Sequence, residues 1–346
     1  MSDTEMDIRV MLLNLLRASS PSGNEEQVID LFRKHISPYV TDVSVDVNGN
    51  CIAHKSGSGS KIMLIAHADE VGLMIHYIDE RGFLYFKEIG GVDTSLLPGQ
   101  KIAIEGINSP VIGVIGKKPI HLQDKTDTPK NINPEDLWID IGAKDKKDAE
   151  QKVQIGQVAT IISEPVLLSD KIVASKSLDD RIGLAILIAV AEKLGKTNAD
   201  VYFVASAQEE LGSVGAHTVT ECILPDVGIA IDVTHATDYP TMSVVKDGDI
   251  KLGTGVVIAV GPNIHKSVSD KLLNVAVESN IPYQMEALPK RTGTDARAIQ
   301  VAGTGVAAGL LSIPCRYMHT PNEVVSIADA ESAVNLIIEY LRLYNN

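Results

Sequence analysis

The chain has 346 residues, of which 45% are hydrophobic and 22% are charged, so it can bury a core and does not have the composition of a disordered protein. At this length we expect one large domain and a smaller one. The formal net charge of -14 argues against nucleic acid as a partner, because nucleic-acid binding needs clustered Lys and Arg.

The first part of the chain predicts the start of an α/β unit. Two helices are expected, one over about residues 6–18 and one after Ser22, where the sequence Ser-Gly-Asn-Glu predicts a capping box. Alternating valines before Asn48-Gly49 predict a β-hairpin. Residues 61–66, which are apolar after Lys61, predict a buried strand that delivers His67.

The pattern changes between residues 71 and 165. Short alternating strands are separated there by turn signals such as Leu97-Pro98-Gly99, which is typical of a small β-barrel or sandwich. We therefore predict an inserted β-rich domain over residues 71–165 and a discontinuous α/β domain over 1–70 and 166–346. None of the candidate site residues lies inside the insertion.

After the insertion the alternation of helices and strands resumes. The expected elements are a helix over 180–194, strands over 200–206 and 227–231, a helix between those strands, a helix near 267–279 and a last helix over 328–344.

The compartment is predicted from targeting signals and cysteines. The N-terminus lacks the order of a signal peptide, and the longest apolar run, residues 182–191, is too short to span a bilayer. The three cysteines are widely spaced and form no CxxC pair. We expect a cytoplasmic protein with no membrane contact.

Side chains of the metal-ligating type follow the apolar runs. The carboxyl ends of strands in an open α/β sheet converge on one crevice, so residues distant in sequence can meet there. Two divalent ions need a bridging carboxylate and terminal His, Asp or Glu ligands. We expect Asp179 to bridge, with His67 and Asp232 completing one ion and Glu210 and His319 completing the other.

Further residues beside these ligands have predicted roles. Asp69 is expected to orient the imidazole of His67. Of Glu209 and Glu210, one can hold metal while the other acts as general base, and the residues alone leave the order open. Thr294 and Asp295 are interpreted either as a helix N-cap or as substrate contacts.

His265 lies in a predicted loop near the crevice, where it could also contact substrate, although a surface histidine is the more common interpretation.

Six segments of the chain together resemble the tetrahedral (TET) aminopeptidase family of dinuclear metallopeptidases, which includes glutamyl aminopeptidases and some members once named glucanases. The resemblance covers nearly the whole chain in the right order, and its segments are AHADEVGLM, SKSLDDRIG, AQEELGSVGA, AIDVT, RTGTDA and YMHTPNEVVS.

The resemblance implies a mixed-sheet α/β/α metallopeptidase domain interrupted by a β-rich, PDZ-like dimerisation domain. It also implies two zinc or cobalt ions, peptide substrates with a free N-terminus, and homo-oligomers in which dimers assemble into a dodecamer. Carried over residue by residue, the resemblance assigns Glu209 as the general acid and base. It places Asp69 behind His67, on the side of the ring away from the metal. It assigns five metal ligands: His67, Asp179, Glu210, Asp232 and His319.

Three other interpretations fit part of this sequence pattern. The same metal chemistry can serve a deacylase or a carboxypeptidase, neither of which requires a free substrate amine. Paired carboxylates can serve a glycoside hydrolase, but that mechanism has no use for His67 and His319. A binding protein that keeps the fold would have no need for a complete set of ligands.

Overall fold

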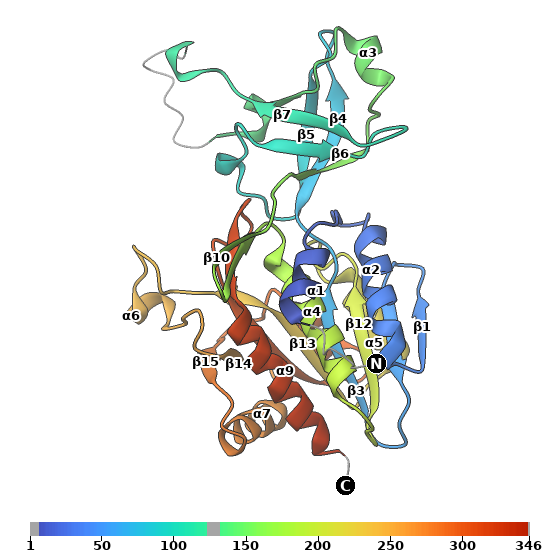
Figure 1. The fold of residues 1–346 in the computed structure, drawn as a ribbon, viewed down its shortest axis with the longest axis vertical. Helices are drawn as coiled ribbons and strands as arrows, with labels where there is room; N and C mark the ends of the chain where they lie inside the picture. The colour runs from blue at the N-terminus through green and yellow to red at the C-terminus, as the bar shows by residue number, and fades with distance from the viewer. Residues whose placement is uncertain (1–6, 123–131, 345–346) are drawn as a thin grey trace.

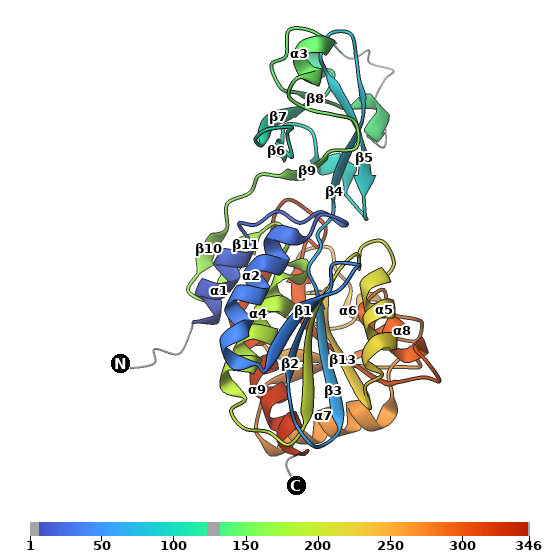
Figure 2. The same cartoon turned by 90° about the vertical axis from the view of Figure 1, so that its right-hand side faces the viewer.

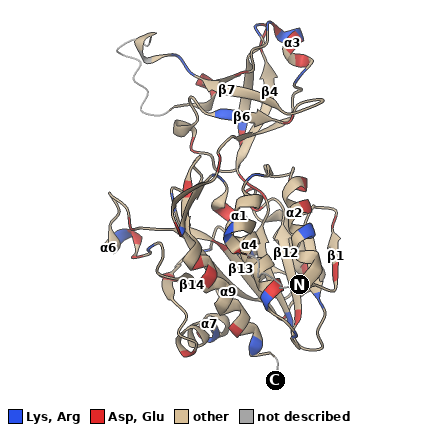
Figure 3. Ribbon diagram, viewed as in Figure 1, with Lys and Arg blue, Asp and Glu red and all other residues tan. Residues whose placement is uncertain are grey.

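The computed structural model describes residues 7–122 and 132–344, which form a larger α/β body and a smaller β-barrel (Figures 1 and 2). The chain enters the barrel at β4 and leaves it after β9, so segments on both sides of the insertion build the α/β body. This architecture confirms the predicted mixed α/β class with an inserted β-rich barrel. Acidic and basic residues are interspersed over both bodies (Figure 3).

An 11-stranded mixed sheet forms the centre of the α/β body, in the order β1-β2-β12-β3-β13-β16-β17-β11-β10, with β14 paired to β16 and to β15. The consecutive strands β12, β3, β13 and β16 are parallel, so their C-terminal ends share one edge of the sheet. The predicted hairpin is confirmed as the antiparallel pair β1 and β2. The strands are β1 (Asp42–Val45), β2 (Cys51–Lys55), β3 (Lys61–His67), β10 (Val166–Ser169), β11 (Ile172–Ser175), β12 (Asp200–Ser206), β13 (Val227–His235), β14 (Val256–Val260), β15 (Tyr283–Ala287), β16 (Ala307–Arg316) and β17 (Glu323–Ser326).

Helices cover both faces of this sheet (Figure 2). Alternate residues of β3 enter different cores: Ile62 and Leu64 join one apolar cluster, and Met63 and Ile65 join the other. One cluster lies under α1 (Ile8–Leu15), α2 (Glu26–Ile36), α4 (Leu178–Lys193), α7 (Lys266–Glu278) and α9 (Ile327–Arg342), and the other under α5 (Val214–Ile223) and α8 (Asp295–Val301). Two short elements, η1 (Ser37–Tyr39) and α6 (Val244–Asp247), complete the body.

Helix α4 lies inside the protein. Its residues are buried without interruption from Leu178 to Ala191, which confirms the helix expected from the long apolar run. Among the residues that the structure describes, no helix is both long enough and apolar enough to cross a membrane.

The start of α2 differs from the prediction. The helix begins at Glu26 with Glu25 as its N-cap residue, and no side chain caps it, so the predicted capping box is wrong. The hydroxyl of Ser22 instead donates a hydrogen bond to Asp69 at the sheet edge. The Ser22 side chain thus contacts a carboxylate that is distant in sequence instead of capping the helix that follows it.

The barrel closes in the strand order β4-β5-β8-β7-β6-β9. It has its own core, in which Ile75, Phe86, Ile102 and Ile139 are buried. The elements are β4 (Gly72–Ile78), β5 (Leu84–Ile89), η2 (Thr94–Leu96), β6 (Lys101–Ile104), β7 (Val111–Gly116), η3 (Ile120–Leu122), η4 (Pro134–Asp136), β8 (Trp138–Asp140), α3 (Lys146–Glu150) and β9 (Val158–Ile161).

Candidate metal centre

The C-terminal edge of the parallel strands carries the predicted metal ligands. His67 is the last residue of β3, Asp232 lies in the second half of β13, and Asp179 lies in the first turn of α4. Glu210 follows β12, and His319 lies in the connection between β16 and β17. The fold therefore brings these five side chains together from separate segments of the chain.

Their donor atoms form two groups that share Asp179: one with His67 and Asp232, the other with Glu210 and His319, each with its atoms within 4.8 Å of one another. His67 Nε2 is 2.9 Å from Asp179 Oδ1 and 4.0 Å from Asp232 Oδ1. His319 Nε2 is 3.3 Å from Asp179 Oδ2 and 3.3 Å from Glu210 Oε1. Imidazole and carboxylate are donors that zinc and similar divalent ions take, so each group has a donor set that could hold such an ion, and Asp179 belongs to both groups.

Both histidines turn the same ring nitrogen toward the carboxylates. His319 Nδ1 lies 2.8 Å from the carbonyl oxygen of Gly91, which can only accept, so Nδ1 carries the proton. His67 Nδ1 lies 3.1 Å from the carbonyl oxygen of Asp69 and 3.3 Å from its carboxylate. In each ring Nε2 is left as the donor atom for a metal, which is the usual arrangement of a ligating histidine.

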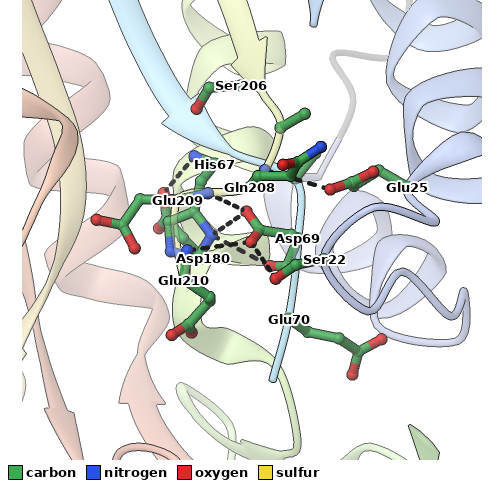
Figure 4. A network of polar contacts seen from close by, with 12 residues as sticks. Ser22, Glu25, His67, Asp69, Glu70, Asp180, Ser206, Gln208, Glu209 and Glu210 are labelled. Carbon is green, nitrogen blue, oxygen red and sulfur yellow. Dashed lines mark hydrogen bonds and ion pairs between the residues drawn. The ribbon is translucent and has the colours of Figure 1, made fainter. Parts of the chain in front are cut away.

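The carboxylate of Asp69 ties His67 to the segment after β12 (Figure 4). Its Oδ1 accepts the backbone N–H of Glu209 at 2.9 Å, and its Oδ2 accepts the N–H of Glu210 at 3.1 Å. The hydroxyl of Ser22 donates to Oδ2 at 2.6 Å. Asp69 is fully buried, so these bonds fix the positions of both glutamates relative to His67.

Glu209 and Glu210 have different surroundings. Glu210 belongs to a ligand group, whereas Glu209 belongs to neither group and accepts a hydrogen bond from Ser213 Oγ at 3.2 Å. Burial raises the pKa of Glu209 to about 8, opposed by His67 and reinforced by Asp295 and Glu210. A carboxyl group with a pKa in this range can both accept and donate a proton near neutral pH.

The ligand side chains also shift one another's pKa values. Hydrogen bonds to Asp179 and Glu210 raise the pKa of His319 to about 11. Burial acts to raise the pKa of Asp179, but His319 and His67 outweigh it and hold that pKa below its usual range. Because a metal ion binds neutral imidazole, metal binding at this centre would release protons.

A buried ionic cluster lies beside the ligands. Glu70 forms ion pairs with Lys176 and with Arg181, whose guanidinium is fully buried. Arg181 also donates to the carbonyl oxygen of Ala68, next to His67, at 2.7 Å. Ser177, two residues before Asp179, donates to Glu70. The cluster thus connects the segments that carry His67 and Asp179.

Glu323 is a buried residue for which the sequence predicts no role. It is 2% exposed, and its carboxylate accepts the backbone N–H of Asp179 at 3.0 Å and that of His319 at 2.8 Å. The only sequence signal was its place in the segment YMHTPNEVVS, four residues after His319. Its partners are backbone groups, which leave no mark in a sequence.

The predicted substrate contacts Thr294 and Asp295 have different surroundings. Thr294 is the N-cap of α8, as one interpretation predicted, and it lines a hollow together with Glu209, Glu210, Arg291 and His319. Asp295 is 2% exposed and accepts a hydrogen bond from Ser206 Oγ at 2.5 Å, so its side chain faces the interior.

His265 does not line that hollow. It is the N-cap residue of α7, and its ring contacts Ser267 Oγ at 2.9 Å.

Comparison with known proteins gives consistent results. A family model described as M42 glutamyl aminopeptidase matches residues 49–336. The lysyl aminopeptidase of Pyrococcus furiosus is 37% identical over 329 residues, which cover 94% of this chain and 94% of that protein.

Solved structures of similar sequence share the fold across the chain. An aminopeptidase from the archaeon Desulfurococcus kamchatkensis has a TM-score of 0.91 and 35% identity, with 98% of both chains covered. The TET1 peptidase of Pyrococcus horikoshii, which can assemble into a tetrahedron or a large octahedral shell, has a TM-score of 0.86 and 30% identity, with 96% of this chain and 98% of that chain covered.

Proposed function

The chain belongs to the M42 glutamyl aminopeptidase family, and from this we propose that it is an aminopeptidase that uses two divalent metal ions, zinc or cobalt, to remove the N-terminal residue of peptides. The observation that carries the metal part of the proposal is the pair of His and carboxylate groups that share Asp179. Peptidase activity itself is the common property of the family and of the named relatives.

In this proposal the five ligands would hold both ions, with Asp179 shared between the two groups. When bound, the ions would supply positive charge that activates water and polarises the scissile carbonyl. Glu209 takes a proton from the attacking water on a carboxylate oxygen and then passes it to the leaving amine. The Ser213 hydroxyl holds the Glu209 carboxylate, and Asp69 holds its backbone, so the proton is moved by a group in a fixed position.

We propose that the hollow beside Glu209 and Glu210 receives the start of the peptide. The carboxylates would attract the free α-amino group and so restrict cleavage to the first residue. Thr294, which lines the same hollow, is a candidate substrate contact.

A peptide mixture tests this activity. The metal-loaded protein is incubated with peptides of one set of sequences, half with free and half with acetylated N-termini, and the products are identified by mass spectrometry. We expect stepwise loss of N-terminal residues from the free peptides alone. Cleavage of the acetylated peptides would favour a deacylase or a carboxypeptidase instead, and activity on glucan that survives a chelator would favour a glycoside hydrolase.

We also propose that the protein is a homo-oligomer, with the barrel as the dimer contact and dimers assembling into a dodecamer. Ile112 and Val114 on β7 support a contact there, because they point out of the barrel wall and are 55% and 44% exposed. Light scattering tests this: Ile112→Asp should give a smaller particle. The control Val47→Asp, at a 99% exposed valine of the α/β body, should keep the wild-type mass.

A cytoplasmic location is part of the proposal. It is supported by the three cysteines, which are all unpaired, with Cys51 and Cys315 buried.

A further inference from the structure

Glu323 lies between the two segments that carry Asp179 and His319. It is the first residue of β17, where it pairs with Ser175 at the end of β11, and β11 leads directly into Asp179. On the other side β17 pairs with β16, and the connection between those two strands carries His319. Both neighbouring strands therefore fix the backbone from which the Glu323 side chain extends.

The Glu323 carboxylate uses one oxygen for each ligand segment. Oε2 accepts the N–H of Asp179 at 3.0 Å, and Oε1 accepts the N–H of His319 at 2.8 Å. His319 has a φ of 61°, a left-handed conformation that a residue with a side chain adopts only when its surroundings hold it there. The bond to Oε1 is one of the contacts that hold it.

We propose that Glu323 is a positioning residue that sets the separation of Asp179 and His319, and thereby the affinity of the Asp179–Glu210–His319 group for its metal ion. This inference rests on the proposed function, because it assumes that the group binds metal. It does not extend equally to the other group, because His67 and Asp232 are placed by β3 and β13, and among the described residues the hydrogen bonds of the Glu323 carboxylate go to Asp179 and His319.

Two variants separate geometry from charge. Glu323→Gln keeps the shape of the side chain but has one acceptor oxygen, so its amide N–H₂ must face one of the two backbone donors. Glu323→Asp keeps the charge but is shorter by one methylene, so it cannot reach both N–H groups. If the position of the carboxylate matters, both variants weaken binding of the ion in the Asp179–Glu210–His319 group. If only its charge matters, Glu323→Asp behaves as the wild type.

Asp329 offers a matched control. It is also buried, and its carboxylate also accepts two backbone N–H groups, those of Gly253 and Gly255, each at 2.7 Å. Neither glycine is a candidate ligand. Asp329→Asn therefore imposes the same kind of loss, a buried carboxylate with two backbone partners, away from the metal centre.

The experiment titrates each full-length protein, stripped of metal, with zinc in a calorimeter, and checks folding by circular dichroism. We expect two ions per wild-type chain and per Asp329→Asn chain. We expect both Glu323 variants to bind the ion of the Asp179–Glu210–His319 group about 10–100-fold less tightly, as is typical when a residue that orients a metal ligand is removed. The other ion shares Asp179 but is also held by His67 and Asp232, so its affinity should fall by a smaller factor.

Wild-type affinity for both ions in Glu323→Gln, or wild-type affinity in Glu323→Asp alone, would overturn the inference. Equal weakening of both ions would also overturn it, because it would indicate a general structural effect. A wild-type protein that takes up no zinc would instead contradict the proposed function, so the two failures can be told apart.

Discussion

The buried cluster around Glu70 gives the sharpest stability prediction. The side chain of Glu70 is 3% exposed, and its partners Lys176 and Arg181 are 12% and 0% exposed. Glu70→Gln preserves the volume but leaves two buried cations without their counter-ion. Removing one partner of a buried ion pair costs about 3–5 kcal/mol, so we expect a loss of that size in the free energy of unfolding.

Chemical denaturation of the metal-stripped proteins, followed by circular dichroism, measures this loss without the stabilisation that bound metal adds. The control is Glu331→Gln, which breaks a pair with Lys171 whose side chains are 47% and 60% exposed and should cost at most about 1 kcal/mol. A loss for Glu70→Gln no larger than that of the control would refute the reasoning.

The difference in free energy of unfolding between the wild type and Glu70→Gln should depend on pH. Burial acts to raise the pKa of Glu70, but Lys176 and Arg181 outweigh it and hold that pKa below its usual value of 4.5. The carboxylate therefore stabilises the fold fully above the unfolded-state pKa, and this stabilisation is lost as the pH falls through the lower folded value. The wild type should therefore lose more of its free energy of unfolding than Glu70→Gln as the pH falls, and the two values should approach each other.

Three further predictions concern the metal centre. Glu209→Gln should lower kcat by about 10²–10⁴-fold while metal content, measured by mass spectrometry, stays at the wild-type level; unchanged turnover would remove Glu209 from the mechanism. Asp179→Ala should lose both ions by the same measurement, because both groups share that carboxylate, and retention of one ion would contradict the bridge. Gly91→Ala should lower the calorimetric affinity for the ion that His319 holds, because the new Cβ would lie 3.1 Å from His319 Nδ1. The control Gly293→Ala should leave that affinity unchanged, because no atom lies within 4 Å of its new Cβ.

Much of the centre could be predicted because the ligands lie in or shortly after apolar runs of the sequence. Parallel strands bring their C-terminal ends to one edge, so His67 and Asp232 had to lie near each other once β3 and β13 were neighbours. In contrast, the residues alone could not predict which of Glu209 and Glu210 would be the ligand and which the base. The chain turns at Gln208, which has a φ of 56°, and the direction of the two following side chains depends on that turn rather than on residue type.

Other parts of the centre had no usable signal in the sequence. Ser22 has the spacing of a helix cap, yet its hydroxyl binds Asp69, a contact across 47 positions of the chain. Arg181 follows two aspartates at a predicted helix start, where a charged side chain is usually solvated, yet it is fully buried against Glu70. Long-range pairing decided both cases, and it depends on the tertiary fold.

The most direct test of the account is a metal titration of activity. The stripped protein is given increasing amounts of zinc or cobalt while release of the first residue from a free-amine peptide is followed. The account predicts no turnover without metal and full turnover once two ions are bound per chain. Turnover that persists in the stripped protein, or that stays absent after two ions are bound, would contradict it.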